Sequence, residues 1–203
     1  MNGQRFLNLP QETRETLLRV ATKQFAERGF DGASLNEILA AAGLSKGSYY
    51  YCFEDKEDLF ATVLESAAET LFSRIPVPDF AKVSRARFWP SVEKFLQQWM
   101  EGTDTPTELL QISAHIGDTQ RRNPRLLALQ QRARAYYRSI IDGGQALGCV
   151  RSDLSADDLV TLLEASDQAF DTIIASRRTN VTQDDLTAHV KLVFDTYRRL
   201  LVP

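Results

Sequence analysis

The sequence has few of the residues that mark secreted, metal-binding or membrane-spanning proteins. Its two cysteines, Cys52 and Cys149, form no C-x-x-C pair and give no reason to expect a disulfide or a zinc site. Its two histidines, His115 and His189, are equally isolated, so we expect no metal and no cofactor. No apolar run approaches the roughly eighteen residues that cross a bilayer, and the N-terminus lacks the basic and apolar regions of a secretory leader. We therefore expect a cytoplasmic protein with no membrane contact.

Catalytic motifs are also missing. The chain contains no GxSxG, P-loop, GxGxxG or HExxH pattern, and neither histidine has a nucleophile near it in sequence. These absences favour a protein that is not an enzyme. The formal net charge of −3 argues weakly against a nucleic-acid partner, but an average over 203 residues hides local stripes of charge. A more specific pattern has to decide whether the protein binds nucleic acid.

The alternating pattern of β-strands is absent, and apolar residues recur at helical spacing almost everywhere, which predicts an all-α fold. A first helix runs through Leu17 and Phe25 and stops at Gly29. Ser34 and Glu37 have the spacing of a capping box at the start of a second helix, which ends before Gly43. A third short helix, 46–53, then follows a connection of only three residues.

The clearest break in the chain is at Pro76 and Pro78, which follow a fourth helix capped by Asp55. Beyond it the spacing predicts helices at about 85–101, 107–121, 124–147, 155–178 and 182–201. The predicted organisation is an N-terminal three-helix helix-turn-helix module, residues 1–54, and a larger C-terminal helical domain for ligand binding and dimerisation, residues 55–203, with a connecting helix at 55–75.

The second and third helices carry the strongest functional signal. A supporting helix, a tight turn with glycine and a short second helix predict a helix-turn-helix, whose second helix enters the major groove of DNA. That helix would be SKGSYYYCF, which begins at Ser45. Tyr49 and Phe53 lie four residues apart and share an inward face, while Tyr50 and Tyr51 turn toward solvent. Their phenol hydroxyls can donate to phosphate oxygens and their rings can contact a thymine methyl. Many such helical corners bind nothing, so this spacing alone leaves both readings open.

Longer sequence patterns are more specific than helix spacing. The runs FAERGFDGAS at 25–34, AAGLSKGS at 41–48 and DKEDL at 55–59 stand in register with Glu37-Ile38, Tyr50-Tyr51 and Phe53 between them. From Arg14 to Phe60 the sequence resembles the N-terminal module of the TetR family of bacterial transcriptional regulators. The resemblance implies binding to double-stranded DNA as a homodimer. It implies DNA contacts from Ser45, Lys46, Gly47, Ser48, Tyr50 and Tyr51, and phosphate contacts from Ser34 and Lys56.

Two positions depart from the family pattern. Tyr49 stands where the family usually has leucine, and we expect its ring in the core with its hydroxyl at the rim. Cys52 stands where histidine is common, which removes one DNA-contacting group. A thiol there allows a redox switch in principle, but no adjacent basic residue in the sequence would lower its pKa.

The resemblance also implies that the C-terminal domain binds a small molecule and dimerises through its last two helices. The apolar stripes on those helices supply the predicted dimerisation residues, although the same stripes would serve an internal core: Leu159, Leu163, Phe170, Val190, Val193, Phe194 and Tyr197. Ligand pockets are mostly apolar with few polar groups, and we expect about a third of the candidate residues to line one. The candidates are Phe88, Trp89, Phe95, Trp99, Tyr136, Tyr137 and Phe170, with His115 and Asp171 as polar groups. Gly143-Gly144 inside a predicted helix marks either a kink beside a pocket or a tolerated weak spot.

These patterns predict a DNA-binding transcriptional regulator, a repressor that binds a pseudo-palindromic operator and responds to a small-molecule ligand. A ligand-dependent activator and a helical protein-interaction module are the alternatives. DNA affinity would fall steeply with salt, whereas a protein contact anchored by tyrosine would not.

Overall fold

The computed structural model describes residues 3–101, 108–109, 111–112, 123–176 and 182–203. Within these ranges the chain is all-α and contains no strand. The predicted helix at 107–121 falls mostly outside them. No helix in the described ranges is long and apolar enough to cross a membrane. The helices are α1 (Gly3–Leu7), α2 (Gln11–Gly32), α3 (Leu35–Ala41), α4 (Lys46–Cys52), α5 (Lys56–Arg74), α6 (Phe88–Glu101), α9 (Pro124–Ala146), α10 (Ala156–Ser176) and α11 (Gln183–Leu201), with short 3-10 turns η1 (Phe80–Lys82) and η2 (Arg85–Arg87) before α6.

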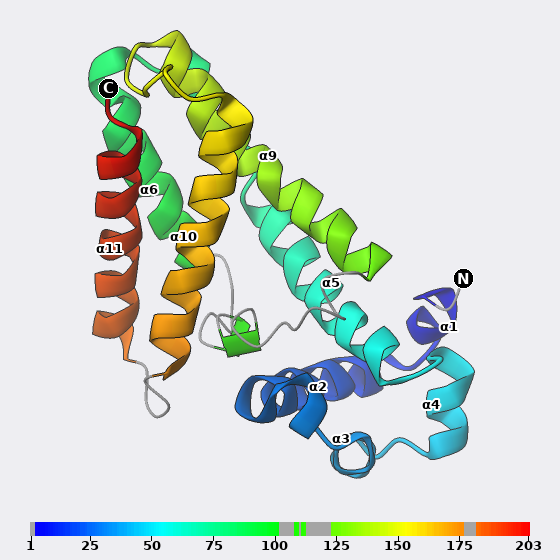
Figure 1. Cartoon of the computed structure of the whole chain (residues 1–203). Coiled ribbons are helices and arrows are strands. Elements are labelled where there is room, and N and C mark those ends of the chain that lie inside the picture. The colour runs from blue at the N-terminus through cyan, green and yellow to red at the C-terminus, as the bar shows by residue number, and fades with distance from the viewer. Residues whose placement is uncertain (1–2, 102–107, 110, 113–122, 177–181) are drawn as a thin grey trace.

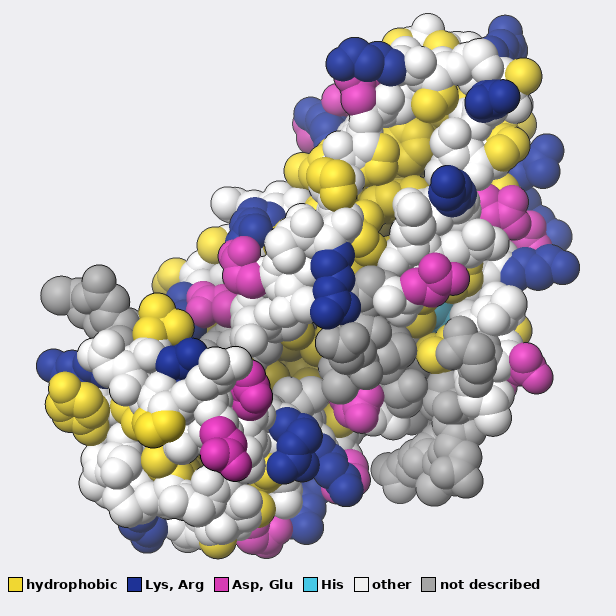
Figure 2. All heavy atoms as spheres, turned by 180° about the vertical axis from the view of Figure 1, so that it is seen from behind, with side chains coloured by type: hydrophobic (Ala, Val, Ile, Leu, Met, Phe, Trp, Pro, Cys, Tyr) yellow, Lys and Arg dark blue, Asp and Glu magenta, His cyan; other side chains and the backbone are white. Residues whose placement is uncertain are grey.

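The helices form two regions joined by α5 and α9. α1 to α4 lie together at one end, with α1 against α4 and α2 against α3 and α5 (Figure 1). α5 leads away from this end alongside α9, and α6, α10 and α11 make up the other region (Figure 1). Seen from behind, apolar side chains gather along the part that holds the C-terminal helices (Figure 2). The helix ends agree with the predicted ones to within a few residues, except that α1 was not predicted.

Side-chain caps set the starts of the helices around the predicted helix-turn-helix. Ser34, Ser45 and Asp55 each accept a hydrogen bond from the backbone N–H three residues further on, at 3.4, 3.1 and 2.9 Å. The carboxylate of Glu37 bonds to Arg28 at 2.9 Å and thereby ties α3 to α2. The predicted starts of α3, α4 and α5 are confirmed.

Glycines end or interrupt the helices at the positions where the sequence predicted helix stops. Gly29, Gly43 and Gly148 have φ values of 68°, 64° and 64°, a backbone conformation that other residues rarely adopt. At Gly29 the helix is interrupted and then resumes to Gly32.

The pair Gly143-Gly144 has a different role from either one predicted. α9 runs without interruption through both residues. A Cβ on Gly144 would lie 2.3 Å from Val150 Cγ2 and 2.6 Å from Phe88 Cζ, and one on Gly143 would lie 2.7 Å from Phe80 Cβ. The two glycines therefore allow η1 and the start of α6 to pack directly against the backbone of α9.

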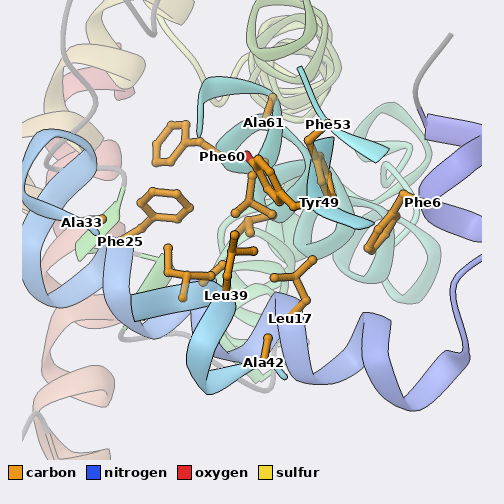
Figure 3. Close-up of a cluster of buried hydrophobic side chains, with 14 of the residues drawn as sticks. Phe6, Leu17, Phe25, Ala33, Leu39, Ala42, Tyr49, Phe53, Phe60 and Ala61 are labelled. Atoms are coloured by element: carbon orange, nitrogen blue, oxygen red, sulfur yellow. The ribbon is translucent and has the colours of Figure 1, made fainter. Parts of the chain in front are cut away.

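Two clusters of buried apolar side chains correspond to the two regions. The first joins α1 to α4 with the beginning of α5, as the rings of Phe6, Phe25, Phe53 and Phe60 show (Figure 3). It also includes Leu126 from the start of α9. The second cluster lies among the end of α5 and α6, α9, α10 and α11. The first turns of α5 thus belong to the N-terminal core, although the sequence pattern grouped this helix with the C-terminal domain.

Candidate nucleic-acid interface and ligand cavity

The three consecutive tyrosines of α4 divide as their helical spacing predicts. Tyr49 is fully buried, whereas Tyr50 and Tyr51 are 58% and 59% exposed. The ring of Tyr49 stacks on Phe53 with centroids 5.1 Å apart, so these two residues anchor α4 to the core. The other two tyrosines face outward from a helix whose inner face is fixed.

The ring of Tyr49 lies in the core, as predicted, and its hydroxyl reaches the edge of the core at exposed Asp55. The hydroxyl donates a hydrogen bond to the backbone carbonyl of Asp55 at 2.6 Å. Burial, with the nearby carboxylates of Asp55 and Asp58, raises the pKa of Tyr49 well above its usual value. This bond also fixes the turn between α4 and α5, because Asp55 is the N-cap of α5.

The first turn of α4 is open to solvent. Ser45, Lys46, Gly47 and Ser48 are all exposed. The hydroxyls of Ser45 and Ser48 lie 2.9 Å apart, and a Cβ on Gly47 would meet nothing closer than 3.9 Å. The turn therefore presents backbone N–H groups, two hydroxyls and a lysine on one accessible surface, which suits a phosphate backbone.

Helix α1 supports α4 from the side, and the sequence reading missed it because five residues are too short for a periodic pattern. The Arg5 guanidinium lies 5.2 Å from the centroid of the Tyr51 ring and donates to the Tyr51 carbonyl at 3.4 Å. The Phe6 ring packs 5.5 Å from Phe53. The apolar pair Phe6-Leu7 was the one available signal. Arg5 consequently stands beside the exposed tyrosines.

Cys52 points into the core and does not face the exposed surface of α4. It is completely buried, and its thiol lies 3.7 Å from the carbonyl oxygen of Arg5. Burial raises its pKa, with a smaller opposing effect from Arg5. A thiol kept protonated in an apolar site is a poor redox sensor.

The two predicted phosphate-binding residues have local structural partners. Ser34 caps α3 and is half-buried. The Lys56 ammonium donates to the carbonyls of Asp31 and Ala33 at 3.3 and 3.1 Å and lies 4.6 Å from the centroid of the Phe30 ring. Lys56 thus holds the end of α2 against α5.

Two adjoining cavities, of about 280 and 350 Å³, lie in the C-terminal region. Residues common to both walls include Leu71, Trp99, Leu109, Ala133, Tyr137, Asp167 and Asp171. Of the candidate residues, Phe95, Trp99, Tyr136, Tyr137 and Asp171 line at least the smaller cavity. His115 lies outside the described residues.

Three candidate aromatics pack elsewhere. Phe88 is fully buried against Trp89, with ring centroids 5.0 Å apart, and Phe170 packs edge-on to His189. None of the three lines either cavity. Conversely, the sequence reading missed Asp167 and His189 in the wall, since a single polar residue on an apolar helix has no diagnostic spacing.

Asp167 is the best-defined polar group of the cavities. The hydroxyls of Tyr137 and Tyr197 both donate to its Oδ2 atom, each at 2.6 Å. Its Oδ1 atom is buried and has no hydrogen-bond partner among the described residues. Burial raises the pKa of Asp167 from its ordinary value of 3.8 to about 6, even though both tyrosine hydrogen bonds act to lower it.

Aromatic rings form an adjacent wall. Tyr136 stacks against Phe95 and Phe72 at centroid distances of 5.5 and 5.6 Å, and Trp99 meets it edge-on at 4.7 Å. The Tyr136 hydroxyl is fixed by a 2.6 Å hydrogen bond to the carbonyl of Ile75. The smaller cavity is therefore bounded by rigid rings on one side and by a carboxylate on another.

Most of the predicted dimerisation residues are used inside the protomer. Leu159, Leu163, Val190, Val193, Phe194 and Tyr197 are all buried, and Phe170 is half-buried. The apolar stripe therefore packs α10 and α11 against α9 and α6, as the core interpretation of the pattern expects. Among the side chains that the structure describes on these helices, the large apolar ones that are exposed are different: Leu162 and Ile173 on α10 and Leu192 on α11.

A cluster of ion pairs joins the two regions at the start of α9. Arg125 forms salt bridges with Asp58 and Glu65 of α5 and donates to the Thr62 hydroxyl at 2.9 Å. No motif in the sequence indicates this junction, because its members are separated by about sixty positions in the chain.

Comparison with known proteins places this architecture in a family. Residues 17–63 match the family described as bacterial regulatory proteins, tetR family. The chain is 30% identical to the HTH-type transcriptional repressor NicS of Pseudomonas putida over 70% of this chain and 68% of NicS. It is also 30% identical to the repressor DhaR of Mycobacterium sp. strain GP1 over 75% of this chain and 77% of DhaR. A 46% identical match to the regulator AcrR of Shigella flexneri spans 27% of this chain and 26% of AcrR.

Solved structures share the fold. The fatty acid degradation regulator FadR from Bacillus halodurans superimposes with a TM-score of 0.74 at 15% identity, over 94% of this chain and 96% of FadR. A TetR family transcriptional regulator from Chloroflexus aurantiacus gives 0.63 at 22% identity, over 98% of each chain. With the family match at its N-terminus and 30% identity to two repressors over more than two thirds of their length, the chain belongs to the TetR family, which consists of transcriptional regulators and not enzymes.

Proposed function

We propose that the protein is a transcriptional repressor that binds a pseudo-palindromic operator in double-stranded DNA as a homodimer and responds to a small molecule in its C-terminal cavity. The observation that carries this proposal is α4, whose inner face is locked by buried Tyr49 while Lys46, Tyr50 and Tyr51 are exposed. A helix fixed on one side and polar-aromatic on the other is suited to the major groove. Such a protein acts in the cytoplasm, where the DNA is.

In this proposal each exposed residue of α4 has a separate task. Lys46 and Tyr50 hold phosphates, and Tyr51, oriented by the Arg5 guanidinium, meets a base edge. Ser45, Gly47 and Ser48 let the DNA backbone approach the N-terminus of α4. Ser34 and Lys56 contact phosphates with the O–H and N–H donors that their local hydrogen bonds do not use.

We assign residues 1–54 to DNA binding and 55–203 to ligand binding and dimerisation, with α5 connecting them. Dimerisation would use the outer faces of α10 and α11, where Leu162, Ile173 and Leu192 are exposed, in a four-helix interface. A ligand in the cavity would reach the N-terminal module through α5 and α9. Such a ligand changes DNA binding only if it binds more tightly to one relative position of the two modules than to another.

Binding isotherms at several salt concentrations test the DNA-binding proposal. Lys46→Ala should weaken binding to operator and random DNA alike and lower the salt slope by about two per dimer, whereas Tyr50→Phe should weaken both with little change in slope. Tyr51→Ala should cost roughly 1–3 kcal/mol on the operator and much less on random DNA. Lys94→Ala, an exposed lysine on α6, is the control for charge alone. Salt-independent binding, or equal effects of Lys46→Ala and Lys94→Ala, would contradict the assignment of α4 as the recognition helix.

A further inference from the structure

The cavities are acidic. The acidic side chains among their described lining residues are Asp167, Asp171 and, in the larger cavity, Glu164. His189 lines the smaller cavity, and no lysine or arginine is among the described lining residues. Glu164 is neutralised by an ion pair with Arg134. An anionic ligand would therefore meet like charge at short range, while a cation would meet opposite charge in a partly enclosed site of low dielectric.

One carboxylate oxygen is available as an acceptor. Asp167 lines both cavities, and both nearby tyrosine hydroxyls donate to its Oδ2 atom. Its Oδ1 atom is buried and has no hydrogen-bond partner among the described residues. A buried acceptor without a donor destabilises the site, and a bound N–H group would remove that cost. The tyrosine bonds also fix the carboxylate plane, so the direction in which Oδ1 accepts is set before a ligand arrives.

Besides the carboxylate, the cavity has an apolar surface, the aromatic wall, against which the body of a ligand can pack. Trp99, Tyr136 and Phe95 line the same cavity as Asp167, and their rings are held against one another. Aromatic faces attract cations and also bury apolar groups, so they suit a molecule that is both.

We propose that this site binds an apolar organic cation whose N–H group donates to Asp167 Oδ1 and whose body packs against Trp99 and Tyr136. This deepens the proposed function by naming the chemical class of the ligand. It rests on the proposed function only for the effect on DNA, because binding itself can be measured on the protein alone.

Calorimetry with three probes that share one body tests the charge requirement at pH 7.5. The probes are 4-phenylbutylammonium, 4-phenylbutanol and 4-phenylbutyrate. We expect the ammonium to bind at least about tenfold more tightly than the alcohol, and the carboxylate to bind most weakly. Asp167→Asn should bring the ammonium to within about twofold of the alcohol. Asp157→Asn, which changes an exposed carboxylate on the same helix, should keep the preference.

Equal or tighter binding of the alcohol or carboxylate to the unchanged protein, or no binding of the ammonium at millimolar concentration, would overturn the proposal without any variant. A preference retained in Asp167→Asn would overturn the assignment of Asp167. Trp99→Leu gives a second check that does not disturb the carboxylate, and it should weaken the ammonium more than the alcohol. If only the ligand proposal is wrong, the protein still binds its operator but shows no preference for the ammonium. If only the proposed function is wrong, the protein binds the ammonium but no operator.

Discussion

The two regions of the molecule use inward-facing tyrosine hydroxyls in opposite ways. In the N-terminal cluster the Tyr49 hydroxyl is satisfied by a backbone carbonyl within the same module, and its ring helps to fill the core. In the C-terminal region the Tyr137 and Tyr197 hydroxyls converge on Asp167 at the edge of a cavity. A filled core presents its functional groups on the outside, as α4 does with Tyr50 and Tyr51. A core with a cavity keeps them inside.

The same contrast appears on the two sides of α10, where neighbouring leucines differ completely in exposure. Leu163 is fully buried and Leu162 is 43% exposed. Leu163→Glu places an unpaired charge in the core and should lower the free energy of unfolding by more than about 3 kcal/mol, the largest effect predicted here. Leu162→Glu should leave the free energy of unfolding of the protomer nearly unchanged and shift the protein toward monomers. Denaturant titration and light scattering distinguish the two variants.

A monomeric unchanged protein at micromolar concentration would contradict the dimer. Dimers that persist in Leu162→Glu would place the interface away from this face.

Glycines provide a second contrast between the regions. Gly144→Ala brings a Cβ within 2.3 Å of Val150 and should lower the free energy of unfolding by about 1–3 kcal/mol through overpacking. In Gly47→Ala on α4 the added Cβ meets only the Ser45 hydroxyl oxygen, at 3.9 Å, so the free energy of unfolding should be unchanged or raised by up to about 1 kcal/mol, while DNA affinity falls. Denaturant titrations measure the first quantity and operator titrations the second. Unaltered operator affinity in Gly47→Ala would show that the DNA backbone does not approach this turn.

The buried carboxylate makes the C-terminal region sensitive to pH. The folded pKa of Asp167, about 6, lies above its ordinary value of 3.8, so the folded state takes up a proton more readily than the unfolded chain. Its contribution to stability is therefore favourable at low pH and is lost as the pH rises from about 4 to 6. Above this window ionised Asp167 destabilises the fold by roughly 1–3 kcal/mol.

Asp167→Asn should accordingly raise the free energy of unfolding at pH 7.5 and raise it less at pH 5, while Asp157→Asn should show no such trend. Denaturant titrations at both pH values measure this difference. The other titratable or charged groups around Asp167 are Glu164, Asp171, Arg134, Tyr137, Tyr197 and His189. If Asp167→Asn raises the free energy of unfolding equally at both pH values, the loss of an ionisable group is not the cause of the increase.

The sequence predicted the N-terminal module better than the C-terminal one for a physical reason. Caps, glycine stops and the outward turn of Tyr50 and Tyr51 follow from spacing within a few residues, and the structure confirms them. The acceptor of the Tyr49 hydroxyl, the Asp55 carbonyl, was not predicted because it belongs to the next turn of the chain.

In the C-terminal region the deciding contacts are between distant segments. A stripe of apolar residues on a helix does not say which neighbour it faces, and most of the residues assigned to the dimer are buried within the protomer. The role of Gly144 depends on Val150 and Phe88, and which oxygen of Asp167 has no partner among the described residues depends on where Tyr137 and Tyr197 donate. These are properties of packing, and a local pattern carries no information about them.

The smallest predicted effect concerns the junction that holds the two regions together. Arg125→Met removes the cation shared by Asp58 and Glu65, and because this cluster is partly exposed the cost should be about 1 kcal/mol. Both tryptophans, Trp89 and Trp99, lie in the C-terminal region, so their fluorescence reports its unfolding while circular dichroism reports all helices. In the unchanged protein the two thermal transitions should coincide, because Leu126 and the ion pairs make α9 part of both cores. In Arg125→Met the dichroism should begin to fall before the fluorescence changes, since the smaller N-terminal module loses its support.

Arg132→Met, which removes an exposed ion pair between the same two helices, is the matched control and should leave the transitions coincident. Coincident transitions in Arg125→Met as well would mean that apolar packing alone connects the regions, and a ligand signal would then have to pass through Leu126 rather than through the charges.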